Sequence, residues 1–80
     1  MMTIKAKIIY KIKKTHPDIE YIKDWKPRKI YTLSDTYRID PDAFFSRDTI
    51  FSFIKSDLRL VAGGGYNSDH IYDVSFDFSW

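Results

Sequence analysis

The sequence predicts an α+β fold: a small, mostly antiparallel sheet of three to four strands, with one amphipathic helix packed on one face. Two segments, residues 3–13 and 70–80, alternate between apolar and polar residues, which is typical of half-buried strands. Between them, residues 46–62 carry apolar side chains at helical spacing. One helix lying across one face of a sheet buries all three apolar surfaces at once. Residues 1–80 are therefore expected to form a single domain.

The composition is that of an ordinary globular domain, with 44% hydrophobic and 30% charged residues. Eighty residues lie near the lower limit for a chain that folds without covalent or metal cross-links. The sequence contains no cysteine, which excludes disulfides and cysteine-bound zinc. Stability must therefore come from packing, and the aromatic residues, 18% of the chain, are the main resource.

Charge and hydropathy give no indication of a nucleic-acid or membrane partner. The net charge of +2, from 13 basic and 11 acidic residues, is too balanced to indicate nucleic acid or an anionic membrane by itself. No apolar run approaches the roughly 18–20 residues that span a bilayer, and the start of the chain does not resemble a signal peptide. We therefore expect a cytoplasmic protein with no membrane association. Abundant Lys, Ile and Tyr hint at an AT-rich genome, and hence at a bacterial or phage accessory protein.

The first strand is expected over residues 3–13. One face is apolar and consists of Ile4, Ala6, Ile8, Tyr10 and Ile12. The other face carries Lys5, Lys7, Lys11 and Lys13. A row of lysines could follow a phosphate backbone. It could equally pair with aspartates of a neighbouring strand, and we favour this structural interpretation because Asp73 and Asp77 lie on the polar face of the last strand.

Residues 14–28 have no clean period and are expected to form either an irregular loop or a short helical turn, from which Ile19, Tyr21, Ile22 and Trp25 could face inward. Pro17 and Pro27 interrupt the segment, and His16-Pro17-Asp18 is typical of a turn. Trp25 lies here among four cations: Lys23, Lys26, Arg28 and Lys29. This is the densest mixture of cationic and aromatic side chains in the sequence, so the loop is a candidate for binding.

Residues 29–33 are expected to form a strand, followed by a turn at Ser34-Asp35. Residues 36–39 either continue that strand after a bulge or pair back as a short hairpin arm. Asp40-Pro41 then ends the extended segment, and residues 42–45 are expected to form a short turn.

The main helix is expected to begin at Ser46, a favoured N-cap residue, with Asp48 in the first turn. Phe45 and Ile50 have the spacing of a hydrophobic staple. An apolar stripe then continues to Val61, and Gly63 can end the helix in the left-handed conformation. In an alternative arrangement the helix ends at Asp57 and residues 58–62 form a strand; we favour the longer helix.

The last strand is expected to place its larger side chains on one face: His70, Tyr72, Val74, Phe76, Phe78 and Trp80. Ile71, Asp73 and Asp77 then belong to the polar face. The preceding Gly63-Gly64-Gly65 follows a helix and leads into a strand. A phosphate-binding loop needs the opposite order, with the glycines leading into a helix N-terminus. We therefore interpret this cluster as a turn.

No motif in the sequence indicates catalysis. His16, Asp18 and Glu20 form one group of potential metal ligands, and Asp69-His70 forms another. Neither has a recognised metal-binding spacing, and no serine is marked as a nucleophile. The sequence therefore predicts no enzyme activity, no metal site and no cofactor.

The remaining hypotheses concern binding. We expect a small protein-binding regulator or inhibitor that acts by surface complementarity, with aromatic and arginine side chains as anchors. The candidate contacts are Trp25, Lys26, Arg28, Tyr66 and Asn67. The alternative is nucleic-acid binding through residues 21–31, where Tyr21, Trp25 and Tyr31 could stack on bases among the basic residues.

Overall fold

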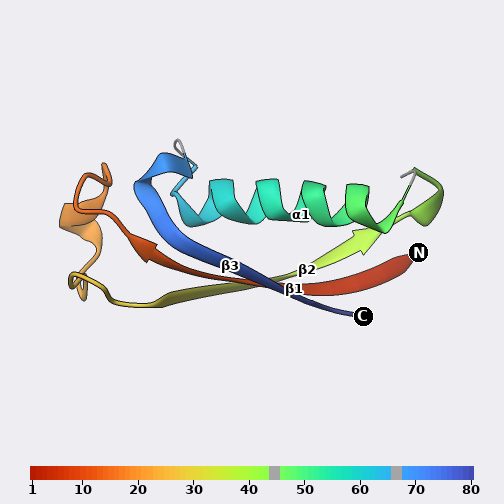
Figure 1. Ribbon diagram of the computed structural model, residues 1–80, viewed down its shortest axis with the longest axis horizontal. Coiled ribbons are helices and arrows are strands. Elements are labelled where there is room, and N and C mark those ends of the chain that lie inside the picture. Colours follow the sequence, from red (N-terminus) through yellow and green to blue (C-terminus); the bar gives the residue numbers. More distant parts are fainter. Residues whose placement is uncertain (44–45, 66–67) are drawn as a thin grey trace.

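The computed structural model describes residues 1–43, 46–65 and 68–80. It consists of a three-stranded antiparallel sheet with one helix lying along one face (Figure 1). The elements are β1 (Met2–Ile12), β2 (Tyr31–Ile39), α1 (Arg47–Ala62) and β3 (Ile71–Ser79), with short 3-10 turns at Ile19–Tyr21, Pro41–Ala43 and Ser68–His70. The strand order is β2-β1-β3. The predicted α+β architecture is confirmed, with three strands rather than four. No helix within the described ranges is long and apolar enough to cross a membrane.

β1 is the central strand, and its predicted alternation is confirmed. The five apolar-face residues are all buried: Ile4, Ala6, Ile8, Tyr10 and Ile12. Because β1 pairs with both neighbours, Ile8 lies opposite Leu33 of β2 and Phe76 of β3, and these side chains share the face covered by the helix. Alternate residues of β1, from Ile4 to Ile12, thus form the centre of the core.

α1 begins as predicted. The Ser46 hydroxyl accepts the backbone N–H of Thr49 at 3.3 Å, which satisfies one of the free donors of the first turn. Ile50, Ile54, Leu58 and Ala62 form the buried stripe. The helix continues to Ala62, so the alternative strand over residues 58–62 is wrong.

The glycine turn differs from the prediction in detail. Gly63 has a φ of −79° and is not left-handed. The left-handed residues are Gly64 and Gly65, with φ of 74° and 76°. The N–H groups of Gly63 and Gly65 bond to the carbonyls of Arg59 and Leu60, so the chain turns over two residues after the helix ends.

β2 is longer than predicted. The turn predicted at Ser34-Asp35 does not form, and the strand runs without interruption from Tyr31 to Ile39. Ser34 lies opposite Lys7, and Asp35 lies opposite Ala6. Polar turn-forming residues are accommodated because β2 is an edge strand, where exposed side chains are solvated on one side.

The predicted faces of β3 are wrong at the start of the strand. Asp73 and Val74 together oppose the single residue Tyr10, because Ile9 pairs with Ser75 and Lys11 pairs with Tyr72. Asp73 has a φ of 50°, and this bulge restarts the alternation. Ile71 therefore lies in the core opposite Ile12, and Tyr72 lies on the polar face, the reverse of the prediction. His70 precedes the strand and ends the turn Ser68–His70.

Candidate functional site

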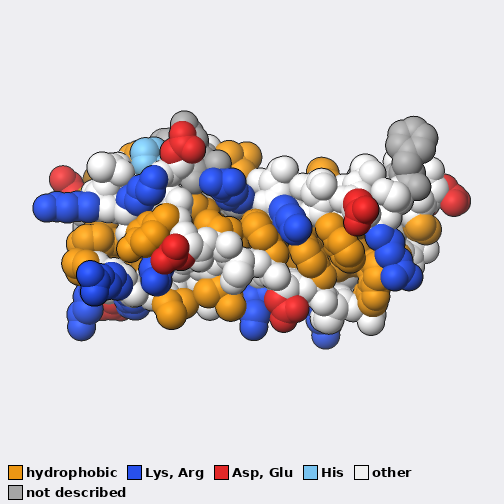
Figure 2. Space-filling model, in the orientation of Figure 1, with side chains coloured by type: hydrophobic (Ala, Val, Ile, Leu, Met, Phe, Trp, Pro, Cys, Tyr) orange, Lys and Arg blue, Asp and Glu red, His pale blue; other side chains and the backbone are white. Residues whose placement is uncertain are grey.

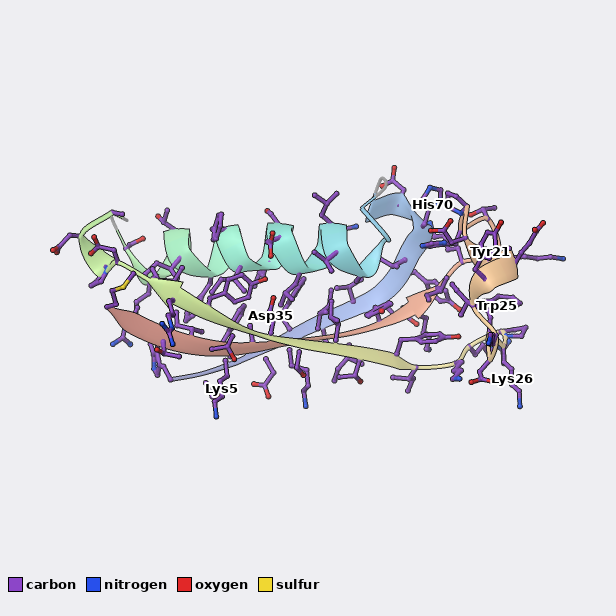
Figure 3. The ribbon with its side chains drawn as sticks, turned by 180° about the vertical axis from the view of Figure 1, so that it is seen from behind. Lys5, Tyr21, Trp25, Lys26, Asp35 and His70 are labelled. Atoms are coloured by element: carbon purple, nitrogen blue, oxygen red, sulfur yellow. The ribbon has the colours of Figure 1, made fainter. Side chains whose placement is uncertain are left out.

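The predicted binding loop holds its tryptophan inward. Trp25 packs against the core, and its indole N–H donates to the carbonyl of Ile12 at 3.1 Å. Lys26 and Arg28 are exposed, and Arg28 has a left-handed φ of 67°. Figure 3 shows Trp25 and Lys26 at one end of the molecule, with Lys26 directed outward. The other two predicted contacts, Tyr66 and Asn67, lie outside the described residues.

The two histidines, which belong to separate groups in the sequence, meet in the fold. The end of β1 and the start of β3 are neighbours, so the ring of His16 lies 5.7 Å from the ring of His70, edge to face. His16 is buried, and its Nδ1 accepts the backbone N–H of Asp18 at 3.0 Å. Across the described ranges, no cluster of three His, Cys, Asp or Glu residues could hold a metal ion. The two rings contact each other at this end of the sheet.

A row of aromatic rings lies where α1 faces β3. It consists of Phe51 from the helix and Phe76, Phe78 and Trp80 from the C-terminal segment, and we call it the aromatic strip. Phe51 stacks on Phe78 with centroids 4.5 Å apart and lies 5.4 Å from Trp80, and Phe76 stacks on Phe78 at 6.4 Å. The rings remain partly open to solvent, and Trp80 is 53% exposed. Figure 2 shows hydrophobic side chains gathered along this side of the molecule.

Two cations from the helix lie over the aromatic strip. The Arg47 guanidinium lies 4.4 Å from the centroid of Trp80. The Lys55 ammonium lies 5.9 Å from the centroid of Phe76 and 6.0 Å from that of Phe78. All three distances are within the range of a cation–π interaction. The surface is therefore apolar in the middle and positively charged along the helix.

The position of α1 explains why these rings stay accessible. The helix backbone lies over β1 and β2 rather than over β3. Long side chains therefore connect the helix to β3: Phe51 stacks on Phe78, and Phe76 extends this stack along β3. Rings that fill a gap at the margin of a core keep one edge in water.

The opposite margin of the helix is polar. The hydroxyl of Tyr37 on β2 donates to Oδ2 of Asp57 on α1. Burial, followed by the hydrogen bond to the Asp57 carboxylate and the nearby charges of Asp57 and Asp35, raises the pKa of Tyr37 well above its ordinary value. This side of the helix thus carries carboxylates where the other side carries cations.

The sheet face turned away from the helix carries the lysines of β1. Lys11 forms an ion pair with Asp73 at 3.0 Å, and Lys7 lies directly opposite Asp77. Figure 3 shows Lys5 directed away from the helix on this face, where residues of all three strands line a shallow depression of about 430 Å³. The expected pairing of lysines with aspartates is confirmed, so the charges partly cancel across this face.

The sequence carries a signal for the aromatic strip, although its spacing alone is that of core residues. Arg47, Phe51 and Lys55 are spaced four residues apart, which places them in one line along the helix. Phe76, Phe78 and Trp80 alternate along one face of β3. Both patterns predict core positions for these rings, because neither pattern alone specifies the lateral position of the helix over the sheet.

The chain matches no protein-family model, and comparisons with curated proteins and with solved structures found no significant match.

Proposed function

We propose that this chain is a non-catalytic protein-binding module, and that the aromatic strip with Arg47 and Lys55 is its contact surface. The observation that carries the proposal is the stack of partly exposed rings beneath two cations. Aromatic and arginine side chains are the residue types that most often dominate the free energy of protein association. A small bacterial or phage accessory protein of the cytoplasm, acting as a regulator or inhibitor by surface complementarity, fits these features.

The rings also suit binding on energetic grounds. They are already held in place by stacking, so little side-chain entropy is lost when a partner covers them. Covering apolar surface stabilises a complex by roughly 25 cal/mol per Å² before the costs of association. The two cations add a preference for partners with acidic groups beside their apolar contacts.

Selection from a displayed library of random peptides tests the proposal. We expect the full chain to enrich peptides that combine acidic and aromatic residues. Binding of these peptides should be lost in Lys55→Glu and Arg47→Glu, because each substitution replaces a cation over the rings with a carboxylate. Lys26→Glu is the matched control, because it reverses an exposed charge in the loop that contains Trp25.

Two results would reject the proposal. One is a selection that enriches no peptide above an unrelated protein of similar charge. The other is enrichment that Lys26→Glu abolishes and Lys55→Glu does not, which would assign binding to the loop.

Nucleic-acid binding through residues 21–31 is a second candidate. The observation in its favour is that Tyr21 is 79% exposed at the end of the molecule that also carries the exposed Lys23, Lys26 and Arg28. Titration of single- and double-stranded oligonucleotides over a salt series tests it, since phosphate contacts make affinity fall steeply with salt. Lys26→Ala should weaken this binding, and an absence of binding at low salt would reject the candidate.

A further inference from the structure

We infer that the partner binds as an extended strand added to the outer edge of β3, with acidic and apolar side chains on its helix side and basic side chains on the other. This inference rests on the proposed function, because it names the binding mode and the partner chemistry of the same surface. Three features of the fold support it: a free strand edge, the contrast between the two edges of the sheet, and the charges on either side of β3.

The edge of β3 is available for pairing. In the order β2-β1-β3, β3 pairs with β1 on one side and with no other strand among residues 1–43, 46–65 and 68–80. After the bulge at Asp73 and Val74, residues 75–79 keep a regular register with β1 and contain no proline. An edge of this kind presents backbone N–H and C=O groups that an incoming strand can bond.

The edge of β2 is protected by its own side chains. Asp35 lies on the helix side of the sheet, opposite Ala6, and an inward-pointing charge discourages strand addition. Its Oδ1 also accepts the backbone N–H of Thr36 at 2.8 Å, which occupies a donor of the strand. Figure 3 labels Asp35 on the edge strand β2, where its side chain is exposed.

β3 carries no such inward charge. Its residues on the helix side after the bulge are Val74, Phe76 and Phe78, all packed against the core. An added strand would lie about 4.8 Å from β3, so its helix-side residues would contact the aromatic strip directly.

The charges around β3 differ between the two faces of the sheet. Arg47 and Lys55 lie on the helix side, over the rings. Asp73 and Asp77 lie on the other side and are exposed. Because the side chains of an added strand alternate between these faces, acidic residues would suit one face and basic residues the other.

The same charges argue against a second copy of this chain as the occupant. Pairing two β3 edges would bring Arg47 and Lys55 of one copy toward those of the other, on the same face of a continuous sheet. Like charges in this arrangement repel. A heterologous strand with the complementary pattern has no such cost.

Fluorescence anisotropy with two labelled peptides tests the pattern. Both contain the same residues, two Asp, two Phe and three Lys, a length of about seven residues that is sufficient to span residues 75–79 of β3. In the first, Asp and Phe alternate with Lys; in the second, the same residues are arranged in blocks that mix the two faces. We expect the block peptide to bind at least about fivefold more weakly, because it loses several cross-strand charge pairs.

Charge reversal sharpens this test. Lys55→Glu should weaken binding of the alternating peptide and strengthen binding of a version with Lys and Phe on one face and Asp on the other. Lys26→Glu should change neither affinity. Equal affinities of the alternating and block peptides would overturn the proposed alternation.

Amide hydrogen exchange of the full chain, followed by NMR with the alternating peptide bound, identifies the edge. Alternate amides of β3 between Val74 and Ser79 should become protected, because only every second N–H points toward the added strand. Amides of β2 should exchange at unchanged rates.

The outcomes separate this inference from the proposed function. Peptide binding that Lys55→Glu abolishes, but that protects no β3 amide, would overturn strand addition and leave the protein-binding function standing. If neither these peptides nor any library peptide binds, the proposed function fails. A dimer in sedimentation without peptide, with β3 amides protected, would overturn the heterologous occupant in favour of a second copy.

Discussion

Along its β2 side, α1 is held by a hydrogen bond from Tyr37 to Asp57, whereas along its β3 side it is held by the stacked rings of Phe51 and Phe78. The first contact is polar, directional and made between two side chains. The second is apolar and extended, and Arg47 and Lys55 lie over it.

If the proposed function is right, this difference places stability and recognition together on the β3 side of the helix. The polar side satisfies its own groups, so a partner gains little there. The aromatic side contributes to folding while keeping ring surface in water, and that surface is available to a partner. Four predictions test this contrast, from the largest expected effect to the smallest.

Truncating Ile54, which lies in the core between the polar and the aromatic sides of the helix, should have the largest effect on stability. Ile54 is fully buried under the helix, and Ile54→Ala should lower the free energy of unfolding by about 3 kcal/mol, from lost burial and the cavity left behind. Urea unfolding followed by circular dichroism measures this. Leu60→Ala, at a position 48% exposed on the same helix, is the control and should change little. Equal losses would contradict the assigned core.

Removing a ring from the aromatic side should have the second largest effect on stability. Phe78→Ala removes the ring that stacks on both Phe51 and Phe76, and we expect a loss of about 2 kcal/mol, less than for a fully buried ring. The same urea experiment measures it. Trp80→Ala should cost less because that side chain is 53% exposed. The reverse order would mean that Trp80 rather than Phe78 secures this side.

Removing the hydrogen bond on the polar side should lower the free energy of unfolding by about 1 kcal/mol. It should also change how stability depends on pH in the alkaline range. Tyr37→Phe removes the hydrogen bond to Asp57. Because the pKa of Tyr37 is raised in the folded chain, its protonated hydroxyl stabilises the fold fully below the unfolded value of about 10. That contribution is lost as pH rises from there toward the folded pKa.

Unfolding free energies measured between neutral pH and pH values above that of free tyrosine check this linkage. The wild type should lose stability with rising pH more steeply than Tyr37→Phe. Identical alkaline slopes in the two proteins would contradict the role given to Tyr37.

The smallest effect is expected from the ion pair on the outer face of the sheet. Lys11→Ala should cost about 0.5 kcal/mol or less, because the Asp73 side chain is 64% exposed and solvent screens the pair. The loss should shrink further in high salt. A salt-independent loss above 1 kcal/mol would indicate that Lys11 acts through packing of its aliphatic chain.

Local patterns predicted most of the fold. Alternation identified the buried face of β1, and capping chemistry placed the start of α1 at Ser46. These features depend on neighbouring residues in the chain, so the sequence is sufficient for them. The turn expected at Ser34-Asp35 failed because pairing with β1 outweighs local turn preference on a long strand.

The candidate site was harder to predict because it depends on how elements pack. Trp25 lies among cations in the sequence, as a binding residue would, yet its indole N–H donates to the Ile12 carbonyl and its ring packs against the core. Phe76 and Phe78 have the pattern of core residues, yet they remain partly exposed because α1 lies toward β2. The lateral position of a helix over a sheet is set by tertiary packing and leaves no trace in periodicity.

The bulge at Asp73 gives β3 a tolerance to change in length. Residues 71–72 and residues 75–79 each keep their own register with β1. Between them Asp73 and Val74 oppose the single residue Tyr10, so Asp73 is one residue more than the partner strand supplies. A chain that lacks this one residue is therefore expected to pair Tyr72 with Lys11 and Ser75 with Ile9 as before. Deletion of Asp73 should thus leave Ile71 in the core and the aromatic strip in its present orientation.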